Sequence, residues 1–236
     1  LDTDGGDVTW TDPTHMMYAL NLHADFNEKF RGGLMAYYLN GDAALAGEYA
    51  GDIQTYGVYG GFDFTPAVTF QGIYYMQKID DLAAGVEDSP KLWKAQLNLK
   101  QDLLKFTSLW IEYSQEDNTF LSLNQLGGGQ GAYDWSGNTF FLANRGWNNG
   151  TSKILFVRAD QKWNDKWSSF LRYAQADVDA VGTDDTKMWT VGIAMQYTPA
   201  INFQLAYDQI DYGTGNVVGG GSLGRNGTES VVRFRT

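Results

Sequence analysis

The chain has 236 residues, 43% of them hydrophobic and 19% charged, a balance that excludes a disordered polymer. Its formal net charge of -11 argues against a nucleic-acid partner, because nucleic acid is bound by basic surfaces. The sequence has no cysteine and therefore no disulfide, and a mean hydropathy of -0.35 without a long uncharged apolar run excludes transmembrane helices.

Apolar and polar residues alternate through most of the chain, and a period of two predicts long β-strands with one apolar face. We expect ten strands around five short turns, plus a last strand, while a further strand before His15 would make twelve. After a loop over Leu1–Pro13, the alternating segments are His15–Phe26, Phe30–Tyr38, Tyr56–Phe64, Val68–Tyr74, Trp93–Leu99, Leu109–Tyr113, Leu155–Trp163, Trp167–Tyr173, Trp189–Tyr197, Ile201–Tyr207 and Val232–Phe234.

The short turns form an internal repeat. F-N-E-K-F at Phe26–Phe30 matches W-N-D-K-W at Trp163–Trp167, and F-T-P-A-V-T-F-Q at Phe64–Gln71 matches Y-T-P-A-I-N-F-Q at Tyr197–Gln204. We expect a three-residue turn in each hairpin, with the flanking residues opposite each other on the apolar face. For the Thr198-Pro199-Ala200 turn these are Tyr197 and Ile201.

The longer connections all fall at the other end of the strands. This asymmetry is typical of an outer-membrane barrel with periplasmic turns and extracellular loops. The longest connection, 114–151, contains G-G-G-Q-G and lacks the Lys and Ser/Thr of a phosphate-binding loop. The expected loops are Gly41–Gly51 with some helical character, the acidic Asp80–Pro90, Ser114–Thr151, the acidic Asp177–Asp185 and the Gly-rich Tyr212–Gly227.

We therefore predict one all-β domain over residues 1–236, a transmembrane antiparallel up-and-down β-barrel of twelve or more strands. Such barrels usually end on an aromatic residue, whereas this chain ends at Thr236, two residues after Phe234. On that ground the segment is expected to belong to an intact barrel of about 14 to 18 strands.

The apolar stripe is expected to face lipid. A tilted strand from Trp189 to Tyr197 rises by about 20 Å, close to the height of a lipid-facing band. Tryptophans in this stripe could also stack on carbohydrate, but their phase favours membrane anchoring. The expected membrane-girdle residues are Phe26, Phe30, Trp93, Trp163, Trp167, Trp189 and Tyr197.

The polar stripe is expected to line water. A lysine or arginine facing lipid at the midplane costs roughly 2 to 4 kcal/mol, so these side chains should face inward. A dry interior does not hold many charges without close pairing, which predicts a water-filled lumen. The expected pore-lining residues are Arg31, Lys94, Lys100, Arg158, Asp160, Arg172, Asp208, Arg233 and Arg235.

Two of these arginines suggest a constriction. A three-residue turn at Asn164–Lys166 sets Arg158 opposite Arg172, and like charges there repel unless water separates them. Opposed to carboxylates, they would create a transverse field that sorts solutes by charge. In the alternative, water separates them or Asp160 pairs with them as an ordinary lumen charge. If the 114–151 loop folds inward, the carboxylates would be Glu116, Asp117 and Asp134.

Several phrases resemble known proteins. W-S-S-F-L-R-Y at Trp167–Tyr173, Y-T-P-A-I-N-F-Q-L-A-Y-D at Tyr197–Asp208 and the terminal V-V-R-F-R-T look like Gram-negative outer-membrane porins. The resemblance is closest to the homotrimeric porin family of sulfate-reducing bacteria. It implies a trimer of water-filled barrels in the outer membrane, through which small hydrophilic solutes and ions diffuse passively.

Three functions remain open: a general diffusion porin, a channel selective for sugars or small anions, and a non-pore β protein of the surface or of soluble type. Tyr37, Tyr59 and Tyr75 would serve as binding groups in the selective channel. A soluble module would need inward Leu and Val and loops of similar length at both ends. No Ser-His-acid grouping suggests an enzyme. We expect no cofactor or metal, since Val181 occupies a ligand position of an EF-hand in the Asp177–Asp185 loop.

Overall fold

The computed structural model describes residues 17–39, 52–80, 87–117, 120, 151–179, 184–211 and 227–236. This part of the chain holds eleven strands and one short helix, and the strands correspond to the eleven alternating segments of the sequence. Within it, no helix is both long enough and apolar enough to cross a membrane. The elements are β1 (Met17–Asp25), β2 (Phe30–Leu39), β3 (Ile53–Thr65), β4 (Val68–Ile79), β5 (Lys91–Leu99), α1 (Gln101–Leu104), β6 (Ser108–Glu116), β7 (Ser152–Lys162), β8 (Trp167–Val178), β9 (Thr186–Thr198), β10 (Ile201–Asp211) and β11 (Thr228–Arg235).

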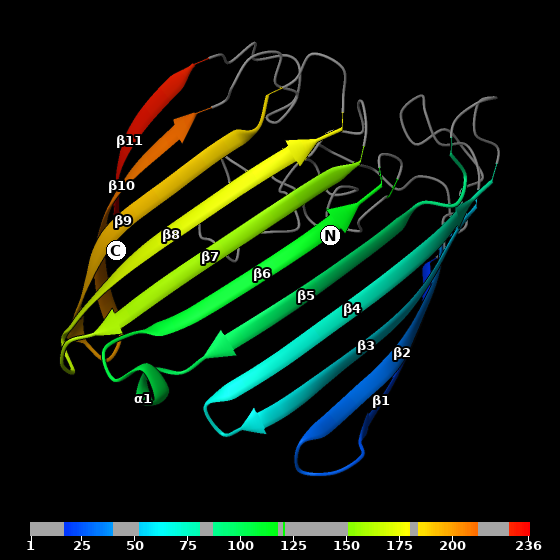
Figure 1. Ribbon diagram of the computed structural model, residues 1–236, viewed down its shortest axis with the longest axis horizontal. Helices are drawn as coiled ribbons and strands as arrows, with labels where there is room; N and C mark the ends of the chain where they lie inside the picture. The colour runs from blue at the N-terminus through cyan, green and yellow to red at the C-terminus, as the bar shows by residue number, and fades with distance from the viewer. Residues whose placement is uncertain are drawn as a thin grey trace.

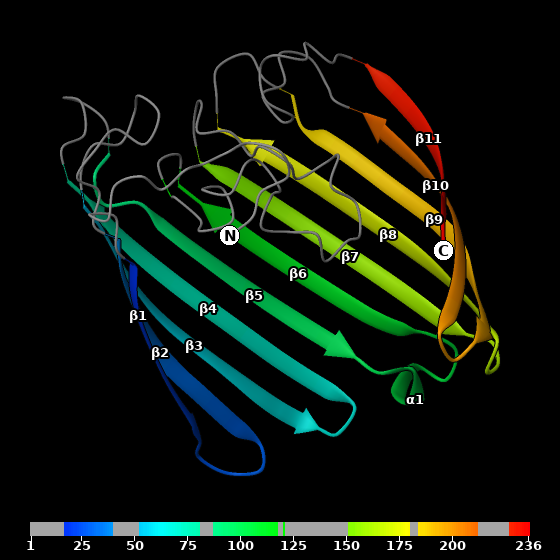
Figure 2. The ribbon, with the colours of Figure 1, turned by 180° about the vertical axis from the view of Figure 1, so that it is seen from behind.

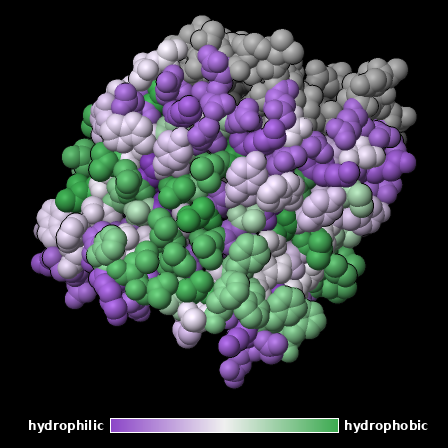
Figure 3. Space-filling view, viewed as in Figure 1, coloured by the Kyte–Doolittle hydropathy of each residue, from purple (hydrophilic) through white to green (hydrophobic). Residues whose placement is uncertain are grey.

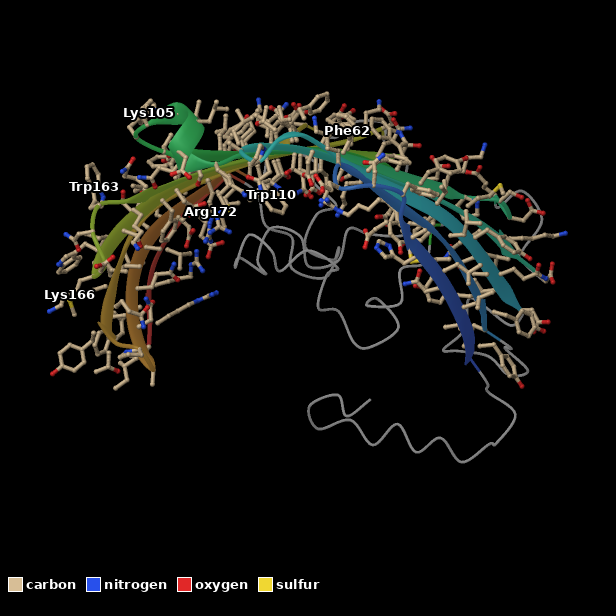
Figure 4. All side chains as sticks on the ribbon, turned by 90° about the horizontal axis from the view of Figure 1, so that it is seen from below. Phe62, Lys105, Trp110, Trp163, Lys166 and Arg172 are labelled. Atoms are coloured by element: carbon tan, nitrogen blue, oxygen red, sulfur yellow. The ribbon has the colours of Figure 1, made fainter. Side chains whose placement is uncertain are left out.

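All eleven strands form one antiparallel up-and-down sheet in chain order, which confirms the all-β class and the topology. The strands lie side by side and run obliquely in the view of Figures 1 and 2. The short turns and α1 lie together at one end of the sheet, here called the turn end. Seen from below, the sheet curves into an arch whose two edges are β1 and β11 (Figure 4). Closure into a barrel of twelve or more strands remains a prediction.

The two Asn-containing turns are built identically, which explains their repeat. Asn27 Oδ1 accepts the backbone N–H groups of Lys29 and Phe30 at 2.8 and 2.9 Å. Asn164 Oδ1 accepts those of Lys166 and Trp167, both at 2.9 Å. The side chain thus satisfies two amides that a three-residue loop leaves unpaired. This turn fixes the register of β7 and β8, and Arg158 lies opposite Arg172 as predicted.

The two Thr-Pro-Ala turns differ from the prediction. Thr198 pairs with Ile201 across a two-residue turn, and the register shifts so that Gln196 pairs with Asn202. Tyr197 is therefore the extra residue of a bulge and does not lie opposite Ile201. The first such turn has the same bulge between Asp63 and Thr65. In each, the threonine hydroxyl accepts the alanine N–H, at 3.2 Å in one and 3.3 Å in the other, which tightens the loop.

The convex face of the arch is apolar and exposed. Figure 3 shows hydrophobic residues gathered across this face, with hydrophilic residues above and below. The sequence-predicted girdle residues all lie here, with Trp163 at 66% and Tyr197 at 64% exposure. Figure 4 shows Phe62 and Trp163 on the outer side and Trp110 and Arg172 on the inner side. The alternation of the sequence therefore separates the two faces as expected.

The concave face is not uniformly polar, which corrects the prediction that one face is apolar and the other is charged. Phe156, Met188 and Ile210 follow one another across β7, β9 and β10, and they face inward with exposures of 2% or less. Ala174 of β8 lies between them in the same row. We call the end opposite the turns the loop end. The inward-facing residues of these strands are apolar near the loop end and polar nearer the turn end.

Several predictions fall outside the described residues. These are the Leu1–Pro13 loop, the helical character of the Gly41–Gly51 connection and almost all of the 114–151 loop with Asp134. Parts of the two acidic loops and the Gly-rich Tyr212–Gly227 segment up to residue 226 also lie outside.

Candidate functional site

One row of directly paired residues crosses the concave face near its middle, and we call it the polar row. Its carboxylates lie at the two ends and its arginines near the centre, so charge changes sign along the wall. Seven of its eight side chains are polar or charged, and the exception is one tryptophan. The row runs Asp63, Thr69, Asn98, Trp110, Arg158, Arg172, Thr190 and Asp208, from β3 to β10.

Each end of the polar row carries the same three-residue arrangement. At one end, Thr69 Oγ1 donates to Asp63 at 2.6 Å, and Arg31 Nη1 donates to the same carboxylate at 2.8 Å. At the other end, Thr190 Oγ1 donates to Asp208 at 2.5 Å, and Arg233 of β11 pairs with that carboxylate through Nε and through Nη2 at 2.8 Å.

These two ends differ in burial. The Arg31 and Asp63 side chains are 33% and 27% exposed, whereas Arg233 and Asp208 are 13% and 1% exposed. A buried carboxylate is stable only with charge-assisted hydrogen bonds of this kind, so the Asp208 arrangement is the stronger structural constraint.

Cross-strand ion pairs on this face reach diagonally. Arg31 directly faces Gly61, Lys94 faces Ser114 and Arg233 faces Ala206. Each small residue leaves room for the long cation to lean toward an acid two residues along the neighbouring strand. The acid is Asp63 for Arg31 and Asp208 for Arg233. For Lys94 it is Glu112, whose carboxylate lies 3.1 Å from Lys94 Nζ and is 3% exposed.

The central arginines occupy different surroundings. Arg158 pairs with Asp160 on its own strand, with Nε–Oδ2 at 2.6 Å and Nη2–Oδ1 at 2.9 Å. Arg172 is 7% exposed, and its guanidinium carbon lies 4.4 Å from the centroid of Phe170. Phe170 in turn lies over Gly192, where a Cβ would overlap its ring. The group of two arginines and one aspartate carries a formal charge of +1.

Two of the carboxylates predicted to oppose these arginines, Glu116 and Asp117, are among the described residues. Both lie away from the arginine pair. Glu116 is the last residue of β6, six residues from the level of Arg158, or roughly 20 Å along the strand. Asp117 accepts the backbone N–H of Lys91 at 2.9 Å and so connects the loop-end termini of β5 and β6. Neither contacts the arginine pair.

Two further predicted pore residues lie near the turn end. Lys100 follows β5 and is exposed, and its backbone N–H donates to Ala67 O at 2.9 Å. Arg235 pairs with Gln204 in the register of β10 and β11, and is exposed.

A cavity of about 440 Å³ opens on the concave side of β1–β5. Tyr59 stacks on His23, with ring centroids 5.8 Å apart, and covers the space above Gly33, where a Cβ would overlap it. Tyr37 and Tyr75 are not part of the lining and donate their hydroxyls to Met35 Sδ at 3.3 and 3.6 Å. The lining residues are His23, Arg31, Met35, Tyr59, Gly60, Gly61, Gln71, Gly72, Ile73, Lys94 and Gln96.

Three residues of the concave face that contact the charged side chains were not predicted from the sequence. Asp63 lies between Phe62 and Phe64, and its phase alone would have assigned it to the inner face. Trp110 and Phe170 share that inward phase, although aromatic residues were expected on the lipid side. Trp110 Nε1 donates to Glu112 Oε2 at 3.3 Å, so its indole joins the polar network.

Across the described ranges, no three His, Cys, Asp or Glu side chains group closely enough to hold a metal ion.

Comparison with solved structures shows a distant structural likeness. No protein-family model and no curated protein matches the sequence. A solved structure of the NanC porin in a rhombohedral crystal form is similar over 94% of this chain and 91% of the porin chain, with 11% sequence identity and a TM-score of 0.46. The comparisons do not support the closer resemblance to porins of sulfate-reducing bacteria.

Proposed function

We propose that this chain forms the wall of an outer-membrane channel through which small hydrophilic solutes and ions diffuse passively, without catalysis. The observation that carries the proposal is the division of one curved sheet between an exposed apolar convex face and a concave face crossed by the polar row. Only a surface with lipid outside and water inside stabilises both faces at once.

The convex face has the layout of a lipid-contacting surface. Its middle is aliphatic, with side chains between 44% and 71% exposed: Leu20, Leu22, Leu34, Val58, Leu171, Val191, Ile193, Leu205 and Val232. Aromatic residues border this band at the turn end, where Phe26 stacks on Phe30 at 5.1 Å and Phe62 contacts Phe64 edge-on at 4.9 Å. Exposed apolar surface on this scale is unfavourable in water.

Tyrosines border the band at the loop end, and their hydroxyls turn away from it. Tyr173 donates to Gln175 at 2.8 Å and Tyr56 donates to Gln54 at 3.1 Å. The Tyr207 hydroxyl lies 2.9 Å from Ser230 Oγ. In each case the partner lies closer to the loop end. An amphipathic ring with its polar tip toward water is typical of a membrane interface.

Closure of the arch is part of the proposal. β1 and β11 run in the same direction, because eleven consecutive antiparallel strands place the first and last parallel. An unpaired strand edge is excluded from the hydrocarbon layer, and bacterial barrels have even strand numbers. At least one more strand, antiparallel to both edges, is therefore needed between them. Assembly into a homotrimer belongs to the proposal as well, and unheated gel electrophoresis in detergent tests it.

Planar-bilayer recording tests the channel. Purified, refolded protein should insert and give stepwise increases in conductance, whereas heat-denatured protein from the same preparation should give none. Refolded protein that enters vesicles without any conductance step would instead favour a surface or structural role.

Removing the central arginine charges should change ion selectivity. In the double variant Arg158→Gln and Arg172→Gln, a net cationic group becomes anionic through Asp160. A unit charge at about 10 Å in water contributes about 0.4 kcal/mol. The loss of two positive charges therefore favours cations and disfavours anions by about fourfold each, and it changes the cation-to-anion permeability ratio by roughly sixteenfold at low salt. The reversal potential in a KCl gradient measures this ratio. The matched variant, with lysine at both positions, should retain the original value, and an unchanged potential in the glutamine variant would remove these arginines from the constriction.

A further inference from the structure

The cavity on β1–β5 is lined by the basic partner of each of three acid–base pairs. Arg31 pairs with Asp63, Lys94 pairs with Glu112, and His23 Nε2 lies 3.3 Å from Asp25 Oδ1. The cavity lining includes His23, Arg31 and Lys94. The three acids lie outside the lining. Three strands therefore contribute a basic side chain to the lining of one space and hold the compensating carboxylates outside that lining.

The floor of this cavity is backbone. Gly61 faces the concave side, and a Cβ there would lie 3.1 Å from Arg31 Nε and 3.3 Å from Arg31 Cζ. The guanidinium therefore lies flat across the glycine, and its bond to Asp63 uses one of its five N–H donors. A Cβ at Gly60 or Gly72 would point to the convex face, where the nearest atoms include Phe30 and Phe70. These two glycines thus offer only peptide groups to the cavity.

The remaining lining supplies neutral hydrogen-bonding groups and apolar contacts. Gln71 and Gln96 lie directly opposite each other on β4 and β5 and contribute amides. The Tyr59 ring and the Met35 side chain contribute apolar surface. The volume of about 440 Å³ lies in the range of small-molecule sites.

We propose that this cavity is a binding subsite for a small organic anion that also carries hydroxyl groups. The carboxylate would bind at Arg31, and the hydroxyls would bind the amides of Gln71 and Gln96, which follow Arg31 and Gly61 in one row of directly paired residues. Because the cavity opens on the proposed lumen, this inference rests on the proposed function and gives it a substrate class. A solute bound to one wall slows the passage of other ions, and this block is measured as a decrease in the channel current.

Gluconate is the probe, and sorbitol is its neutral counterpart with the same six-carbon chain of hydroxyls. Gluconate should reduce the single-channel current of the wild-type protein in a concentration-dependent way, and sorbitol at the same concentration should not. Titration calorimetry of gluconate into refolded protein in detergent micelles measures binding independently of conductance.

Two variants locate the site. Gly61→Leu places a side chain on the cavity floor and displaces Arg31, while Gly72→Leu adds the same side chain on the convex face, where the nearest atom is 3.7 Å from its Cβ. We expect Gly61→Leu to abolish the block and Gly72→Leu to preserve it. Arg31→Gln, which leaves the backbone unchanged, should raise the half-blocking concentration about tenfold through the loss of a charged hydrogen bond.

The outcomes separate this inference from the proposed function. Conductance without gluconate binding or block overturns the subsite and leaves the channel. Gluconate binding in micelles without conductance supports the subsite and overturns the channel. Equal block of wild-type and Gly61→Leu channels, or equal block by sorbitol and gluconate, also overturns the subsite.

Discussion

Replacing Leu205 by arginine should lower the free energy of unfolding by about 2 to 4 kcal/mol when the protein is folded in phospholipid vesicles. Leu205 is 50% exposed on the convex face and pairs with Ile193, which lies midway between Trp189 and Tyr197. An arginine there meets hydrocarbon at the centre of the aliphatic band. If this face met water, the same substitution at an exposed site would change the stability by no more than about 0.5 kcal/mol.

The neighbouring position supplies the control. Gln204 lies on the concave face, directly opposite Ala194 and Arg235. In a hydrated lumen Gln204→Arg should cost only the few tenths of a kcal/mol of an opposed like charge. Denaturant titrations followed by tryptophan fluorescence measure both variants. A stability loss of similar size at the two adjacent positions would contradict the assignment of the convex face to lipid.

Asp208→Ala should destabilise the protein by about 3 to 5 kcal/mol. The substitution leaves Arg233, which is 13% exposed, without the carboxylate that it binds through two nitrogens, and it removes the acceptor of the fully buried Thr190 hydroxyl. Most of the loss comes from the uncompensated charge. The additional substitution Arg233→Ala should therefore restore part of the stability, as a double-mutant cycle in the same denaturant titration would measure.

Asp63→Ala serves as the matched variant, because Asp63 makes the same contacts with an arginine and a threonine at the other end of the polar row. Its side chain is 27% exposed, so water replaces the lost carboxylate more readily. We expect a clearly smaller loss of stability than for Asp208→Ala. Equal losses at the two positions would show that burial does not set the strength of these clusters.

Much of the architecture follows from local chemistry. A period of two fixes which side chains share a face, so the eleven strands, the exposed aromatic residues of the convex face and the inward charges can be predicted in order along the chain. The Asn27 and Asn164 turns are equally local, since one side chain closes the loop and sets the register. For this reason the pairing of Arg158 with Arg172 was predictable from the turn.

Other features depend on contacts that alternation does not encode. The bulge at Tyr197 adds one residue to a strand without interrupting the run of side chains, so the pattern gave Ile201 the wrong partner. The alternation also assigns each side chain to a face of the sheet, but it does not predict which residues surround that side chain. Phe156, Met188 and Ile210 share the inward phase with the charges and form an apolar, buried part of the concave face.

By itself, the sequence determined the strand order, which side chains share a face and the register of the Asn turns, because each depends on residues close together in the chain. Only the tertiary structure decided which acid binds which base, since a cation facing Gly61, Ser114 or Ala206 reaches diagonally across a curved sheet. The cavity likewise arises where residues of five neighbouring strands, β1–β5, line one space. Curvature is a property of the whole sheet, and no single strand specifies it.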